Sequence, residues 1–96
     1  MTLEAFKSSL SQPHPPQGLS NLLQAMWHEG KNDWEQAHNI AQDIQSSEGS
    51  WIHAYLHRKE GDQGNAAYWY HRAGKPLPRV PLDQEWEQIV SAFLRA

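Results

Sequence analysis

Two stretches of this chain, residues 22–44 and 51–73, carry the same residue pattern when one is shifted onto the other by 29 positions. The shift needs no gap and superposes four identical pairs: Ala25 and Ala54, His28 and His57, Asp33 and Asp62, Ala37 and Ala66. Apolar positions also coincide, such as Leu23 with Ile52. A repeat of this length is typical of stacked helical hairpins, because one hairpin alone cannot bury its apolar face.

The first copy of the repeat predicts two helices. The first runs from about Ser20 to Lys31, with apolar residues at helical spacing. We expect Asn32 to take the left-handed conformation that ends it, and Asp33 to cap the second helix, with Gln36 completing a capping box. The second helix is expected to carry Ile44 inward, and residues 46–49 to form the turn between the two copies.

The second copy repeats this scheme and is followed by one further helix. Ser50 is the expected N-cap of its first helix, Gly61 the expected end, and Asp62 the N-cap of the next. Gly74 and the prolines that follow it prevent the helix from continuing. Residues 82–95 have an amphipathic helical pattern, which predicts that they cover the open end of the second hairpin.

The predicted fold class is therefore all-α, because no segment alternates apolar and polar residues as a strand does. Ninety-six residues are enough for a single domain. Its expected parts are a short N-terminal helix with a proline-rich lead (1–18), a first hairpin (19–46), a second hairpin (50–74), a proline-rich connector (75–81) and a capping helix (82–96).

Composition argues against several classes of function. The net charge of −3 speaks against nucleic-acid binding, which needs a basic surface. The chain has no cysteine, so disulfides and thiolate metal sites are excluded. No signal peptide is recognisable, and no apolar stretch approaches the roughly 20 residues that span a bilayer. We expect a soluble, cytoplasmic protein without membrane partners.

Small residues recur where two helices of a hairpin would cross. Ala25 is followed by Ala37, and Ala54 by Ala66, in each case 12 positions later. With the string 33–37 (Asp-Trp-Glu-Gln-Ala), these residues resemble a tetratricopeptide-type repeat over roughly residues 20–80. The second copy adds matches at Gly61, Ala66, Tyr70, Ala73 and Pro78.

This resemblance implies a binding or scaffolding role and does not imply catalysis. The chain departs from the family in having two repeats rather than three or more, and a period shorter than the usual 34 residues. The final helix looks like the solvating helix that follows such repeats. Residues 51–70 are also similar to a group of small uncharacterised bacterial proteins, a likeness that brings no function with it.

Histidine spacing suggests a metal site. His53, His57 and Glu60 lie at i, i+4 and i+7, on one face of a helix, and two imidazoles with a carboxylate suit zinc or iron. The three span about 10 Å along the axis, so Glu60 has difficulty reaching a metal bound by both histidines. His28 or His38 is a better additional ligand. The competing interpretation makes His53 and His57 partly buried, hydrogen-bonded residues.

A run of three aromatic residues and a set of basic residues suggest binding surfaces. Consecutive helical residues are 100° apart, so residues 68–70 cannot all face inward. We expect Tyr70 in the core and Tyr68 exposed, beside Arg72, as an interface anchor. Together the basic residues favour an anion or phosphate site as a weaker hypothesis; they are Arg58, Arg72, Lys75 and Arg79.

The favoured function is a non-enzymatic protein-interaction or scaffolding module with no cofactor. The first helices of the two hairpins would line a shallow groove that presents His53, His57 and Arg58 to a peptide or to a second copy of the chain. Tyr68 and Arg72 belong to the same predicted binding set. The alternative is a small zinc- or iron-binding protein or hydrolase that uses His53 and His57, with Glu60 as the third predicted ligand.

Overall fold

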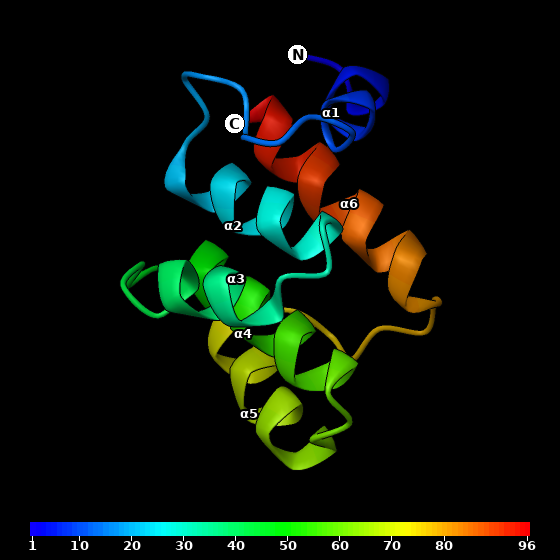
Figure 1. Cartoon of the computed structure of the whole chain (residues 1–96). Coiled ribbons are helices and arrows are strands. Elements are labelled where there is room, and N and C mark those ends of the chain that lie inside the picture. Colours follow the sequence, from blue (N-terminus) through cyan, green and yellow to red (C-terminus); the bar gives the residue numbers. More distant parts are fainter.

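Six α-helices and no strands make up the computed structural model, which describes residues 1–96 (Figure 1). The prediction of an all-α chain is confirmed. None of the helices has the length and apolar character needed to cross a membrane. The helices are α1 (Leu3–Ser9), α2 (Asn21–Gly30), α3 (Trp34–Ala41), α4 (Ser47–Lys59), α5 (Gln63–Ala73) and α6 (Leu82–Arg95).

The helices pack in a sequence that runs from one end of the molecule to the other. α2 lies against α3, α3 against α4, and α4 against α5, while α6 contacts α1, α2 and α4. Figure 1 shows α5 at one end and α1 with the C-terminal part of α6 at the other. The Cα radius of gyration is 12.4 Å, close to the roughly 13 Å of a compact domain of 100 residues.

Polar caps define most of the helix starts. Five N-cap side chains each accept a hydrogen bond from the backbone N–H three positions later; they are Thr2, Ser20, Asp33, Ser46 and Asp62. The cap at Asp33 is confirmed, but the capping box is only half made, because its own N–H donates to the carbonyl of His28 (2.9 Å). Asn32 has a φ of 63° and Gly61 a φ of 90°, so both predicted left-handed helix ends are confirmed.

The predicted turn at residues 46–49 is wrong, because α4 begins there. Ser46, and not Ser50, is the N-cap, and its Oγ accepts from the N–H of Gly49 (3.1 Å). α3 ends at Ala41, so Ile44 lies in the connection between α3 and α4. Gly49 makes the early start possible, since a Cβ at this position would lie 2.2 Å from the carbonyl oxygen of Ile44.

Replacing this glycine tests the tight connection. Gly49→Ala should destabilise the protein by about 1–3 kcal/mol despite the better helix propensity of alanine, because the new methyl group overlaps backbone. The matched control is Gly64→Ala in the first turn of α5, where a Cβ meets nothing within 4 Å and the fold should gain about 0.5–1 kcal/mol. Urea titration of both variants measures the two changes, and equal effects of the two substitutions would contradict the packing of Ile44 on α4.

α6 covers a different face of the bundle than predicted. It was expected at the open end of the second hairpin, but it lies across α2 and α4. Trp86 explains the choice, because its indole N–H donates to the carbonyl of Met26 (3.1 Å) and its ring packs near Phe6. Ile89 and Val90 are fully buried on the same side. The groove expected along α2 and α4 is therefore filled by the chain's own C-terminal helix.

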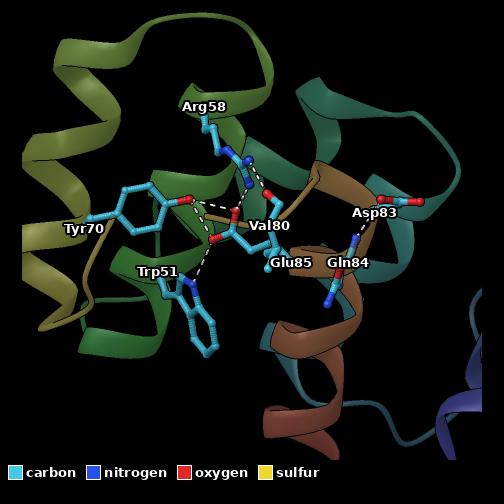
Figure 2. A network of polar contacts seen from close by, with 7 residues as sticks. All are labelled: Trp51, Arg58, Tyr70, Val80, Asp83, Gln84 and Glu85. Carbon is cyan, nitrogen blue, oxygen red and sulfur yellow. Dashed lines mark hydrogen bonds and ion pairs between the residues drawn. The ribbon is translucent and has the colours of Figure 1, made fainter. Parts of the chain in front are cut away.

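A buried carboxylate joins α6 to α4 and α5 (Figure 2). Glu85 is 2% exposed and accepts hydrogen bonds from Tyr70 Oη (2.6 and 2.9 Å), Arg58 Nη1 (2.7 Å) and Trp51 Nε1 (3.3 Å). Arg58 also donates to the carbonyl of Val80 in the connector. Burial, together with the bond to Glu85, raises the pKa of Tyr70 well above its usual range, so the phenol stays a donor. The carboxylate is thus fully partnered.

Neutralising this carboxylate should weaken the fold. Glu85→Gln places an amide N–H₂ among three donors, and it should lower the free energy of unfolding by about 3 kcal/mol, as the loss of one partner of a buried ion pair does. Chemical denaturation measures the change. The matched control is Glu87→Gln on the same helix, which breaks an exposed 2.8 Å pair with Lys7 and should leave stability nearly unchanged. Similar losses in both variants would contradict a special role for Glu85.

Candidate functional site

Three histidines converge on the side of α4 that faces away from α6. His38 comes from α3, and His53 and His57 lie one turn apart on α4. One ring nitrogen of each lies within 4.8 Å of one from each of the others. The ring centroids of His38 are 5.0 Å from His53 and 5.8 Å from His57. The cluster is partly enclosed, because His53 is 6% and His57 8% exposed, whereas His38 is only partly buried.

Two tryptophans hold the imidazole rings in place. Trp34 stacks on His38 with centroids 4.9 Å apart, and its indole N–H donates to the carbonyl of Leu56 (2.9 Å), which fixes α3 on α4. Trp69 of α5 stacks on His53 at 4.3 Å, with the ring planes 14° apart. Helices α3, α4 and α5 therefore all contribute to orienting the cluster.

Glu60 lies beside the cluster and binds only His57. Its Oε1 is 2.7 Å from Nδ1 of His57, so Nε2 is the nitrogen of that ring left to face the other histidines. Of the predicted set His53, His57 and Glu60, the two histidines group with His38 of the neighbouring helix α3, and Glu60 lies outside that group of three. A carboxylate on the far nitrogen of a histidine is the arrangement that orients metal-ligating imidazoles. Glu60 also forms a second, more exposed group with His57 and Asp62.

The cluster is built for neutral imidazoles. Burial, together with the neighbouring His38 and His57, lowers the pKa of His53 to about 4. Burial and His57 also lower the pKa of His38. His53 Nδ1 is buried and has no hydrogen-bond partner in the chain. A buried polar atom without a partner lowers the stability of the fold by about 1–3 kcal/mol, so binding of a ligand to this nitrogen would be stabilising.

The geometry fits a transition metal with three nitrogen ligands. Tetrahedral zinc with Zn–N bonds of about 2.0–2.1 Å places its ligand nitrogens about 3.4 Å apart. The ring nitrogens lie within 4.8 Å of one another, so they have to approach by at most about 1.4 Å to bind one ion. Three histidines leave one coordination position open for water or a small ligand.

A polar hollow of about 640 Å³ borders His53. It lies between the connection from α3 to α4, the first turns of α4 and the side chains of α5. Its lining includes one cationic side chain, Arg72, and no carboxylate. The residues around it are Gln42, Ile44, Gln45, Ser46, Ser47, Ser50, His53, Trp69 and Arg72.

The remaining predicted site residues do not form one surface. Arg58 points to the other side of α4, against Glu85, and its side chain is 21% exposed. Tyr68 is 54% exposed and accepts a hydrogen bond from Arg72 (3.1 Å), as predicted for a surface aromatic residue. Lys75 lies over the ring of Trp51 at 4.2 Å. The basic residues that suggested an anion site are thus separated.

The repeat equivalence of His28 and His57 does not extend to their surroundings. His28 lies on α2 with its ring against the edge of Trp27 and is outside the cluster. His38 aligns in the repeat with Ala67, so the internal repeat gave no sign of its role. Comparison of the chain with protein-family models, with curated proteins and with solved structures finds no match.

The metal-free protein should lose stability in acid through His53. The unfolded histidine takes up a proton near pH 6.5, but His53 in the fold does so only near pH 4, so the unfolded chain binds more protons in between. The loss begins as the pH falls below about 6.5 and is complete below about 4. One pKa unit is worth about 1.4 kcal/mol, so the total is about 3 kcal/mol.

Urea titrations at a series of pH values, with chelator present, measure this loss. The comparison variant is His53→Asn, which cannot be protonated and should lack this component while keeping the contribution of every other group. Identical slopes of unfolding free energy against pH in the two proteins would show that His53 titrates normally in the fold.

Proposed function

We propose that the chain is a small zinc-binding protein in which His38, His53 and His57 bind one metal ion. The observation that carries the proposal is the convergence of three imidazoles from two helices, two of them buried, with one buried ring nitrogen left unpartnered. Three nitrogen ligands favour zinc, since the iron site considered from the sequence needs a carboxylate that Glu60 does not place among them. Glu60 instead orients His57.

In this proposal the scaffold is a pair of tandem, tetratricopeptide-like hairpins, α2 with α3 and α4 with α5. Its support is the burial of the repeated alanines at the contact within each hairpin: Ala25 and Ala37 are fully buried, as is Ala54, and Ala66 is 3% exposed. Small side chains there let the helices approach closely. The second hairpin then supplies two of the three ligands, and the first supplies the third.

Titration of untagged, metal-free protein with Zn²⁺ or Co²⁺ tests the site. We expect one ion per chain and a rise in melting temperature, because a ligand that binds only the folded state stabilises it. His38→Ala, His53→Ala and His57→Ala should each weaken binding by at least about 100-fold. Glu60→Gln should weaken it by about 10- to 100-fold, the usual effect of removing an orienting carboxylate.

His71→Ala is the matched control, since His71 is an exposed histidine outside the cluster. Its metal affinity should equal that of the unchanged protein. Binding that survives His38→Ala, or that falls equally in His71→Ala, would mean that the histidines bind metal nonspecifically. The absence of any stoichiometric metal by elemental analysis and calorimetry would end the proposal.

A second candidate function is protein interaction through the outer face of α5. The observation that favours it is the exposed ring of Tyr68, which lies under the guanidinium of Arg72 at 5.8 Å. Aromatic residues and arginine are the side chains most enriched at interface centres. α5 packs mainly against α4, so its outer face is open to contact a peptide or a second copy of the chain.

A further inference from the structure

We infer that the hollow beside His53 binds a small oxyanion, either phosphate or the phosphate group of a phosphomonoester, which completes the coordination of the metal. The inference rests on the proposed function, because His53 is both a predicted ligand and part of the wall of the hollow. A ligand in the hollow therefore lies beside one of the three proposed metal ligands.

The charge of the site favours an anion. A histidine binds a metal ion as a neutral imidazole, so three histidine ligands leave the full charge of a divalent ion uncompensated. Arg72 is the sole charged side chain in the wall of the hollow. Glu48, in the first turn of α4, lines a different hollow beside Trp51. An anion that enters the hollow would thus lie near the guanidinium of Arg72 and the proposed metal ion, and the wall of the hollow contains no carboxylate.

The first turn of α4 adds hydrogen-bond donors to this positive field. Ser46, Ser47 and Ser50 line the hollow, and the hydroxyl group of Ser47 donates to the carboxylate of Glu48 (3.4 Å). The backbone N–H groups of Ser47 and Glu48 have no partner within the chain, because Gly49 is the first residue whose N–H reaches the cap. Free N–H groups at a helix start, together with the helix dipole, favour anionic oxygen.

A buried, unpartnered side chain distinguishes this helix start from an ordinary one. His53 is 6% exposed, its Nδ1 has no hydrogen-bond partner, and the residue faces the hollow. The proposed groups that would bind the anion come from different elements. They are the metal ion, the guanidinium of Arg72, and the hydroxyl and backbone N–H groups at the start of α4. This arrangement suits the several oxygens of a tetrahedral phosphate better than the two of a carboxylate. A volume of about 640 Å³ lies within the range of small-molecule sites.

The experiment uses Co²⁺-loaded protein, whose visible absorption reports changes in the coordination of the ion. Addition of inorganic phosphate should change the spectrum with saturation, and acetate at the same concentration should bind at least about tenfold more weakly. Arg72→Gln should weaken phosphate binding by about tenfold or more without changing Co²⁺ affinity, because it removes a charged donor. Arg79→Gln, an exposed arginine outside the hollow, is the matched control and should bind phosphate normally.

Each result has one meaning. A response to inorganic phosphate alone identifies free phosphate as the ligand, and a comparable response to 4-nitrophenyl phosphate identifies the phosphate group of an ester. An unchanged Co²⁺ spectrum, equal affinity for acetate and phosphate, or an unaltered phosphate affinity in Arg72→Gln overturns the inference while the metal site stands. Failure to bind Co²⁺ at all overturns the metal site together with it.

Discussion

The packing of α6 against α4 and α5 depends on one buried carboxylate. Glu85 enters the interior from α6 and finds donors on α4 and α5, from Arg58, Trp51 and Tyr70. A buried carboxylate is costly unless it is paired, so these donors favour the observed position of α6. With this side of α4 closed, its opposite side is left to α3, and there the three histidines meet.

Much of the fold follows from local physical chemistry that the sequence displays. Capping side chains such as Asp33 and Asp62, and the left-handed Asn32, act over three or four residues, so their effect can be predicted without a partner. The start of α4 was missed because it depends on a tertiary fit. Ser46 and Ser50 are equally good caps in isolation, and the approach of Ile44 to Gly49 decides between them.

The site was predictable only where its residues share one helix. The spacing of His53 and His57 places both on one face, whereas His38 arrives through packing of α3, which spacing alone does not report. Glu85 was overlooked although a signal existed. It stands four and eight residues before Ile89 and Phe93, so an acidic residue occupies the apolar stripe of the last helix. A charge at such a position indicates a buried partner.

α4 has no face that is free of partners, and this restricts how the molecule can move. His57 and Arg58 are consecutive, about 100° apart around the helix axis, and one is held by Glu60 and the histidine cluster, the other by Glu85. A rotation of the helix that relaxes one set of bonds must stretch the other. The two polar clusters therefore restrain the rotation of α4 together, and loosening either one disturbs the other.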